Sequence, residues 1–131
     1  MSNVAILCVD DEIVVLQSLE IELRNAFGKA YLYEFAESAD EALELIDELA
    51  EEQVRIILIV SDWLMPGTKG DDFLIQVHQK YPRVVTMMLT GHANKAAVER
   101  AKQFANLFAC LYKPWDPEDL ITTIKSALNI L

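Results

Sequence analysis

The sequence predicts an α/β fold in which helices cover both faces of a parallel sheet, giving a three-layer α/β/α sandwich. Short apolar runs at residues 4–9, 31–36, 56–61, 84–89 and 108–112 alternate with segments whose apolar residues recur at helical spacing. The first, third and fourth runs are almost unbroken apolar stretches, which is typical of strands buried on both faces. Five strands, each followed by a helix, account for the chain.

Local signals place the ends of several helices. Gly28 ends the first, the pattern Ser38-x-x-Glu41 is a capping box that opens the second, and Asp116 with Pro117 behind it begins the fifth. The fourth helix is expected near residues 94–104. The inward-facing positions that we expect are, in chain order, Leu16, Leu19, Leu23, Phe27, Ala42, Leu43, Ile46, Leu49, Phe73, Leu74, Val77, Ala97, Ala101, Phe104, Leu120, Ile121, Ile124, Ala127 and Leu128.

Length and charge limit the function classes. At 131 residues and 53% hydrophobic, the chain suits one sizeable core, so we expect a single domain over residues 1–131. Eleven basic residues against 21 acidic ones give a net charge of −10. This balance argues against direct nucleic-acid binding and favours a basic partner surface or a metal ion. The same charge also fits a simpler role, in which an acidic surface keeps the protein soluble.

Cysteine use and the chain's start indicate a compartment. Cys8 and Cys110 fall inside predicted buried strands without metal-ligand or redox spacing, as core residues in a reducing compartment do. We see no export signal and no apolar stretch of membrane-spanning length. We therefore expect a cytoplasmic protein with no membrane contact.

Polar residues follow four of the predicted strands. Asp10 and Asp11 follow the first, Asp62 the third, Thr90 the fourth and Lys113 the fifth. The carboxyl ends of parallel strands share one edge of the sheet, so these groups are expected to converge in one crevice.

The acidic residues point to a metal. A nucleotide- or flavin-binding α/β protein has glycines or hydroxyls after its first strand to cradle phosphate, whereas this chain has Asp10, Asp11 and Glu12. Carboxylates there repel a phosphate unless a divalent cation lies between. Hard oxygen ligands, without a cysteine or histidine cluster, suit Mg²⁺ or Mn²⁺.

Each residue taken alone has a simpler explanation. Asp10 and Asp11 also suit the cap and first turn of a helix. Asp62 also suits a strand-ending turn, and Thr90 also suits a strand end. Lys113 fits such a reading less well, because an ammonium that ends an apolar run needs an anionic partner.

Four segments stand out together: VDDE at 9–12, SDWLMPG at 61–67 with Gly70, LTGHA at 89–93 and YKPW at 112–115. With these segments the chain resembles a known family, the receiver domains of bacterial two-component response regulators. Their order, spacing and residue types match over essentially the whole chain. The resemblance implies a flavodoxin-like (βα)5 fold with strand order 2-1-3-4-5. A weaker likeness is to the receivers found in front of HD-GYP phosphodiesterase or other signalling modules.

The resemblance also implies a metal site. Asp62 is the implied phosphoacceptor and a ligand of Mg²⁺. Asp11 is implied as a direct ligand, Asp10 as one acting largely through water, and Leu64 as a ligand through its backbone carbonyl.

The remaining implied roles concern the phosphoryl group. Thr90 and Lys113 are implied as catalytic groups beside Asp62, and Trp63 and Gly91 join them in binding phosphoryl oxygens. Lys113 is expected to pair with Asp62 before phosphorylation.

The implied partners are a sensor histidine kinase or phosphotransfer protein as donor and an output domain or protein as target. The target binds the surface formed by the fourth helix, fifth strand and fifth helix. A homodimer through the last helix is also plausible. The implied function is a phosphoacceptor signalling domain that catalyses only its own phosphorylation and dephosphorylation.

Three positions depart from the pattern or vary within it. Cys110 stands where receivers commonly carry Tyr or Phe, so the usual aromatic switch is in doubt, and Phe108 or Tyr112 are the candidates to replace it, although Phe108 also fits the core. His92 is expected as a solvent-facing loop residue, with control of phosphoryl lifetime as a hypothesis. Trp63 is expected to be partly exposed and to report metal binding by fluorescence.

Two other function classes fit part of the pattern. A phosphatase of the haloacid-dehalogenase type needs a second Asp two residues after its nucleophile, where this chain has Leu64, and a flavin protein needs a phosphate loop. A receiver-like module that is never phosphorylated has no need of the clustered acids.

Overall fold

A computed structural model of the chain describes residues 3–91 and 95–129, which form five strands and five helices in strict alternation. The strands are β1 Val4–Val9, β2 Leu32–Ala36, β3 Arg55–Ser61, β4 Val85–Thr90 and β5 Leu107–Tyr112. The helices are α1 Ile13–Phe27, α2 Ala39–Glu51, α3 Gly70–Lys80, α4 Lys95–Phe104 and α5 Pro117–Asn129. The expected order of elements is confirmed, with strand bounds shifted by no more than one residue.

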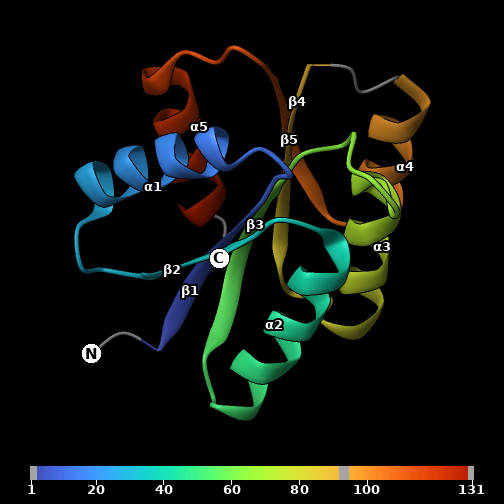
Figure 1. Cartoon of the computed structure of the whole chain (residues 1–131), viewed down its shortest axis with the longest axis horizontal. Helices are drawn as coiled ribbons and strands as arrows, with labels where there is room; N and C mark the ends of the chain where they lie inside the picture. Colours follow the sequence, from blue (N-terminus) through green and yellow to red (C-terminus); the bar gives the residue numbers. More distant parts are fainter. Residues whose placement is uncertain (1–2, 92–94, 130–131) are drawn as a thin grey trace.

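The five strands form one parallel sheet in the order β2-β1-β3-β4-β5 (Figure 1). The predicted fold class is therefore confirmed. Val9 pairs with Ala36 on one side and with Ser61 on the other, so β1, β2 and β3 end at the same level. Thr90 pairs with Tyr112 in the same way. These registers bring the residues that follow the strands to one edge.

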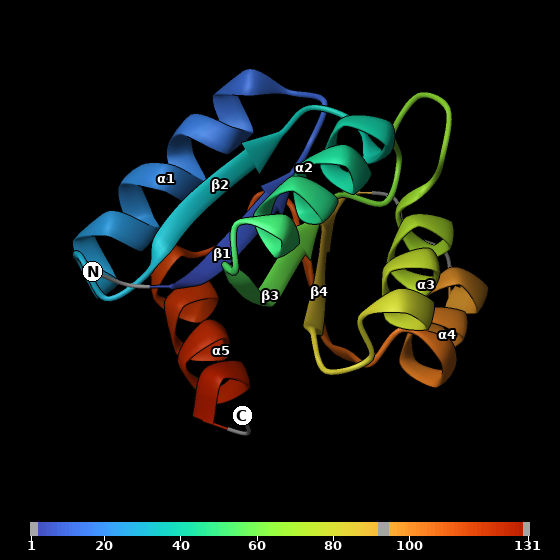
Figure 2. The same ribbon diagram turned by 90° about the horizontal axis from the view of Figure 1, so that it is seen from below.

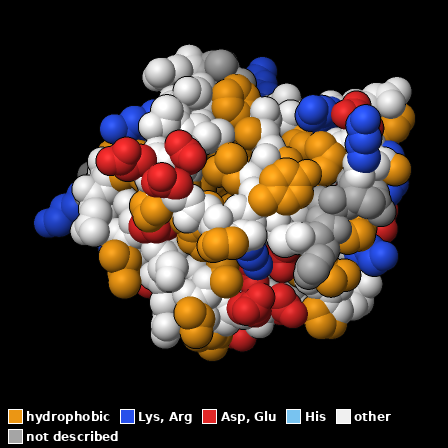
Figure 3. Space-filling view, turned by 90° about the horizontal axis from the view of Figure 1, so that it is seen from above, with side chains coloured by type: hydrophobic (Ala, Val, Ile, Leu, Met, Phe, Trp, Pro, Cys, Tyr) orange, Lys and Arg blue, Asp and Glu red, His pale blue; other side chains and the backbone are white. Residues whose placement is uncertain are grey.

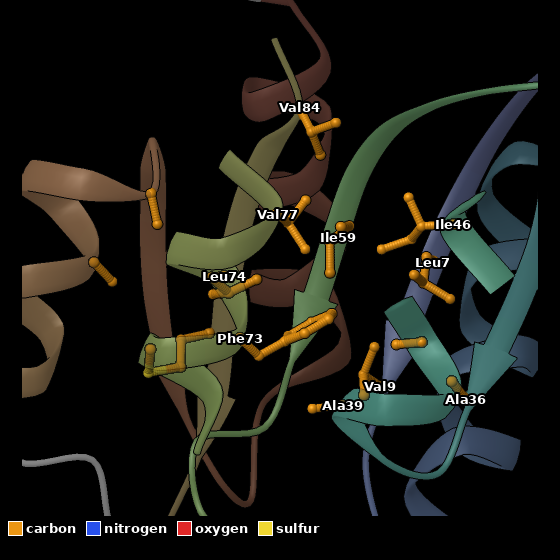
Figure 4. Packing of buried hydrophobic residues seen from close by; sticks show 14 of the residues in the cluster. Leu7, Val9, Ala36, Ala39, Ile46, Ile59, Phe73, Leu74, Val77 and Val84 are labelled. Carbon is orange, nitrogen blue, oxygen red and sulfur yellow. The ribbon is translucent and has the colours of Figure 1, made fainter. Parts of the chain in front are cut away.

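Helices cover both faces of the sheet, and each face has its own apolar cluster (Figures 1 and 2). On one face α1 and α5 pack side chains such as Leu19 and Ile124 against Ile6 and Leu58. On the other face α2, α3 and α4 pack against Leu7, Val9 and Ile59, among other residues, as Figure 4 shows for α2 and α3. Two dry faces explain why the central strands are almost unbroken apolar runs.

The helix ends follow the expected capping chemistry. The Ser38 hydroxyl accepts a hydrogen bond from the Glu41 N–H at 3.1 Å, and the Glu41 carboxylate accepts one from the Glu37 N–H. At α5 the Asp116 carboxylate accepts the Glu118 N–H at 2.8 Å. Both helix starts read from the sequence are confirmed.

Several residues expected inside lie nearer the surface. Phe104, expected on the inner side of α4, is 49% exposed because it is the last residue of the helix and Ala105 takes the buried place behind it. Phe108 is 36% exposed and Cys110 half-buried, because β5 is an edge strand. The core reading of Phe108 is therefore wrong. Phe27, Leu43, Ile121 and Leu128 pack only partly buried against the two clusters.

Within the described part of the chain, no helix has the length and apolar character needed to cross a membrane.

We predict that the two thiols differ in reactivity. Cys8 is fully buried in β1, and burial raises its thiol pKa far above the usual range. Cys110 is half-buried, and burial raises its pKa as well, against the opposing effect of Lys102. Iodoacetamide at pH 8 is therefore expected to modify the native protein slowly and only at Cys110. Peptide mapping checks this; rapid modification of Cys8 in the folded protein would contradict the buried β1.

Candidate functional site

A crevice of about 610 Å³ opens at the carboxyl edge of the sheet. Its lining comes from the loops after β1, β3, β4 and β5 and comprises Asp11, Glu12, Asp62, Leu64, Met65, Pro66, Thr90, Gly91 and Lys113. Figure 3 looks down on the molecule from above and shows acidic side chains next to a Lys or Arg side chain near the middle of that face. The predicted convergence of the strand-end residues is confirmed.

Three carboxylates form the acidic part of the site. Asp10, Asp11 and Asp62 each offer an oxygen within 4.8 Å of the other two. Asp10 and Asp62 are buried and Asp11 is exposed. The backbone fixes the buried pair, since the Asp10 N–H bonds the Ala36 carbonyl and the Asp62 N–H bonds the Val9 carbonyl. Sheet register thus forces two like charges together at the edge.

Lys113 provides the compensating charge. Its ammonium lies 2.8 Å from Asp10 Oδ2, 3.4 Å from Asp62 Oδ2 and 3.8 Å from Glu12 Oε1. The expected pairing with Asp62 is therefore present, but the shorter contact is to Asp10. The peptide between Lys113 and Pro114 is cis.

The ionisation of this group of residues reflects burial and charge. Burial raises the pKa of the Asp10 carboxyl above its usual value, although hydrogen bonds from Lys113 and from the Glu12 N–H act in the opposite direction. Burial acts to lower the pKa of Lys113, but its hydrogen bond to Asp10 and the charges of Asp10 and Asp62 outweigh burial, so the net shift is upward. Lys113 is therefore a cation at neutral pH.

The oxygens suit a hard divalent cation. The acidic group contains no sulfur or imidazole, and three carboxylates with one exposed member leave positions for water and a phosphoryl oxygen. Leu64, whose carbonyl is expected to be a ligand, lines the crevice with its side chain 49% exposed. The donor set fits Mg²⁺ or Mn²⁺.

The hydroxyl and amide expected to bind a phosphoryl group lie across the crevice. Thr90 is buried at the end of β4, and its carbonyl accepts the Lys113 N–H at 3.0 Å. Gly91 lines the crevice beside it. His92, the possible lifetime residue, lies outside the described residues.

The exposure expected for Trp63 is wrong, because its side chain is only 8% exposed. Its backbone N–H donates to Asp62 Oδ1 at 2.8 Å, and its indole N–H donates to Asp71 Oδ1 at 3.0 Å. Trp63 is not among the residues that line the crevice, and it contacts the Asp62 carboxylate through its backbone. The sequence offered no sign of the Asp71 contact, because an acid at a helix start is also the ordinary first-turn residue.

Gly70 fixes α3 against the loop that follows β3. The Gly70 N–H donates to the Trp63 carbonyl at 2.8 Å. A Cβ atom at residue 70 would overlap the Asp62 carbonyl oxygen and crowd the Trp63 Cα. Only glycine permits this close approach of helix and loop.

The two carboxylate oxygens of Asp10 have different partners. Its Oδ1 accepts the Glu12 N–H at 2.8 Å while its Oδ2 contacts Lys113. Helix α1 itself starts after Glu12, whose side chain makes no capping bond. The N–H that Asp10 accepts belongs to the residue before the helix, so Asp10 does not cap α1 and the capping alternative is wrong for this residue.

A larger cavity, about 870 Å³, opens between α2 and α3 at the opposite edge of the sheet. Its walls are mainly aliphatic, with Ile46, Ile56, Val77 and Val84 among them, and it contains none of the clustered acids. The clustered acids and Lys113 belong to the smaller crevice.

Comparison with known proteins identifies this arrangement. Residues 6–125 match the family model described as "Response regulator receiver domain". The chain belongs to the receiver domains of response regulators. The resemblance noted in the sequence is therefore confirmed.

Individual receivers show how far the likeness extends. The chain is 30% identical over 124 residues to the hydrogenase transcriptional regulatory protein HoxA of Cupriavidus necator, covering 95% of this chain and 24% of that protein. The chain thus spans about a quarter of the length of such curated relatives.

Two solved receivers superpose closely. The signal receiver domain of an HD domain-containing protein from Pseudomonas fluorescens Pf-5 has a TM-score of 0.83 and 30% identity, covering 95% of this chain and 86% of that one. A CheY-like receiver from Methanospirillum hungatei JF-1 has a TM-score of 0.82 and 30% identity, with coverages of 95% and 93%.

We predict that removing the Lys113 charge strengthens Mg²⁺ binding. In Lys113→Ala the three carboxylates lose a cation that repels Mg²⁺, so the Mg²⁺ dissociation constant is expected to fall roughly threefold or more. Isothermal titration measures it. Lys125→Ala, which removes an exposed charge from α5, is the matched control and is expected to bind as the wild type does. Weaker binding in Lys113→Ala would contradict the charge assignment.

We also predict that Gly70→Ala destabilises the fold by about 1–3 kcal/mol, because the new methyl group meets backbone atoms that cannot turn aside. Urea denaturation measures the change. Gly91→Ala serves as control, since a Cβ there meets nothing within 4 Å. Equal stability of both variants would show that α3 does not pack in this way on the loop that follows β3.

Proposed function

We propose that this receiver accepts a phosphoryl group on Asp62 from a phosphohistidine of a sensor histidine kinase or phosphotransfer protein. The observation that carries the proposal is the position of Asp62, a buried carboxylate between Lys113 at 3.4 Å and the oxygens of Asp10 and Asp11. A carboxylate so placed can act as a nucleophile while positive charge faces the group it attacks.

The transfer forms one bond and breaks another. An oxygen of Asp62 attacks phosphorus, the bond between phosphorus and the donor imidazole nitrogen breaks, and the nitrogen keeps the electron pair. Of the two Asp62 oxygens, Oδ1 accepts the Trp63 N–H and Oδ2 faces Lys113, so the carboxylate is held in one orientation. Such positioning supplies much of the rate in phosphoryl transfer.

Mg²⁺ is the proposed cofactor, with Mn²⁺ as a substitute. Asp10, Asp11, Asp62 and the Leu64 carbonyl would hold it, with Asp10 acting largely through water. When bound it supplies positive charge to the phosphoryl oxygens. The Lys113 ammonium supplies the same kind of charge from the protein itself.

Thr90 and Gly91 bind the phosphoryl group once it is on Asp62. The Thr90 hydroxyl and the Gly91 N–H donate to phosphoryl oxygens, and Trp63 contributes its backbone N–H. This draws the loop after β4 toward Asp62 and alters the surface formed by α4, β5 and α5. The same groups support the loss of the phosphoryl group to water, so the domain catalyses only its own phosphorylation and dephosphorylation.

The surface of α4, β5 and α5 is the proposed contact for an output domain or partner. Phe104, Phe108 and Tyr112 lie there with 49%, 36% and 58% exposure, and large exposed apolar side chains favour a protein partner. The similar receiver of an HD domain-containing protein supports an HD-type output, and HoxA is a transcriptional regulator. We also propose that the chain can form a homodimer and that it is located in the cytoplasm.

The test is the mass of the intact protein after incubation with acetyl phosphate and Mg²⁺. We expect one added phosphoryl group in the wild type, none in Asp62→Asn and none without Mg²⁺. Asp40→Asn, which removes an exposed acid from α2, is the control and should gain the group. No mass gain in the wild type would favour the module that is never phosphorylated.

A further inference from the structure

Trp63 is anchored from the side away from the crevice. Its indole N–H donates to Asp71 Oδ1 at 3.0 Å, and the Lys69 ammonium lies 5.0 Å from the centre of its ring. The backbone N–H of the same residue donates to the acceptor carboxylate at 2.8 Å. The direction of that N–H therefore depends on how firmly the indole is held.

Asp71 is an unusual partner for an indole because it is a buried carboxylate. Its side chain is 7% exposed although it stands in the first turn of α3. A buried carboxylate needs a cation or several donors to remain ionised. Arg100 supplies the cation, with Nη1 2.6 Å from Asp71 Oδ2.

Arg100 belongs to α4, so the contacts reach a third element. Its guanidinium also donates to Asp72 Oδ1 at 3.1 Å, which holds it across the start of α3. The contacts form one unbroken path from Asp62 through Trp63 and Asp71 to α4. We name it the Trp63–Asp71–Arg100 path.

Packing of α3 against α4 alone does not require this path. Apolar contacts already bury Phe73, Val98 and Ala101 between these helices and the sheet. An apolar residue at 71 would bury without the cost of desolvating a charge. The indole donor, the buried acid and the guanidinium instead form a continuous chain of hydrogen bonds that begins at the residue bonded to Asp62, which is the arrangement expected of groups that orient it.

We propose that Asp71 and Arg100 are positioning residues for the phosphoacceptor, acting through Trp63, and that they link the state of Asp62 to α4. The inference rests on the proposed function of Asp62. Loss of either residue frees the indole and lets the Trp63 N–H, and with it the acceptor oxygen, leave the reactive orientation.

The first test compares phosphorylation rates with acetyl phosphate at saturating Mg²⁺. Trp63→Phe keeps the ring but removes the donor, and Asp71→Ala removes the acceptor. Each single variant is expected to react roughly threefold or more slowly than the wild type. The double variant is expected to be no slower than the slower single variant, because both changes cut the same path. Additive losses, or rates equal to the wild type, would overturn the proposal.

Arg100 allows a test without a substitution at a buried position, since its side chain is 50% exposed. Arg100→Ala is expected to slow phosphorylation, and Arg100→Lys is expected to recover part of the rate because it retains the charge. The Mg²⁺ dissociation constant should stay within about twofold of the wild-type value. Slow phosphorylation explained by weaker Mg²⁺ binding would contradict a positioning role.

A spectroscopic test follows the link to α4. The chain has two tryptophans, so Trp115→Phe leaves Trp63 as the sole indole. Addition of beryllofluoride, a phosphoryl mimic, with Mg²⁺ is expected to shift Trp63 emission and to change hydrogen exchange in α4. Both changes should be reduced in Arg100→Ala. If beryllofluoride changed hydrogen exchange in α4 of Arg100→Ala as much as in the wild type, the proposed link to α4 would be wrong.

Lys80→Ala is the matched control for all of these measurements. It breaks a 2.8 Å ion pair between α3 and Asp47 of α2 that lies outside the path, and wild-type rates are expected. If the wild type itself gains no phosphoryl group, the proposed function fails. If the wild type is phosphorylated and the path variants match it, only the present inference fails.

Discussion

The attraction between one ammonium and a pair of buried carboxylates is the constraint on which the site depends. Asp10 and Asp62 are held side by side because Val9 pairs with Ser61 in the sheet. Two buried like charges with oxygens within 4.8 Å of each other disfavour folding unless a cation compensates. Lys113 reaches both acids from the end of β5, on the far side of β4. The repulsion between these two carboxylates is thus offset by the single positive charge of Lys113.

This arrangement explains why an acidic site can receive an anionic group. A divalent cation held by the carboxylates would, together with Lys113, turn an acidic edge into one that faces a phosphoryl group with positive charge. In the proposed function Lys113 opposes metal binding and assists transfer, so its contribution has opposite signs in the two steps. A site with more lysines would bind metal less well, and one with none would leave Asp10 without its partner.

The sheet and the crevice were predictable because their signals are local. Apolar runs report strands buried on two faces, and polar residues directly behind Val9, Ser61 and Leu89 report a shared edge. The burial of Trp63 was not predictable. It depends on Asp71, eight residues away, and on Arg100 of another helix, and no periodicity in the sequence links those positions.

Edge effects explain the other differences. Phe104 and Phe108 carry the expected apolar character, but α4 ends at the first and β5 has a neighbouring strand on only one side. Cys110 occupies the middle of that edge strand. The proposed coupling between Asp62 and α4 has no aromatic side chain at residue 110 to depend on, and the contacts of Trp63 with Asp71 and Arg100 connect the same two places.

The measurement that tests the account most directly is chemical mapping of the phosphorylated residue. An acyl phosphate reacts with hydroxylamine to give a hydroxamate, which peptide mass spectrometry locates. After treatment with acetyl phosphate and Mg²⁺, the account predicts the hydroxamate at Asp62 and unmodified side chains at Asp10 and Asp11. A hydroxamate at Asp10 or Asp11, or a phosphoryl group that resists hydroxylamine, would contradict the assignment of Asp62 as the acceptor.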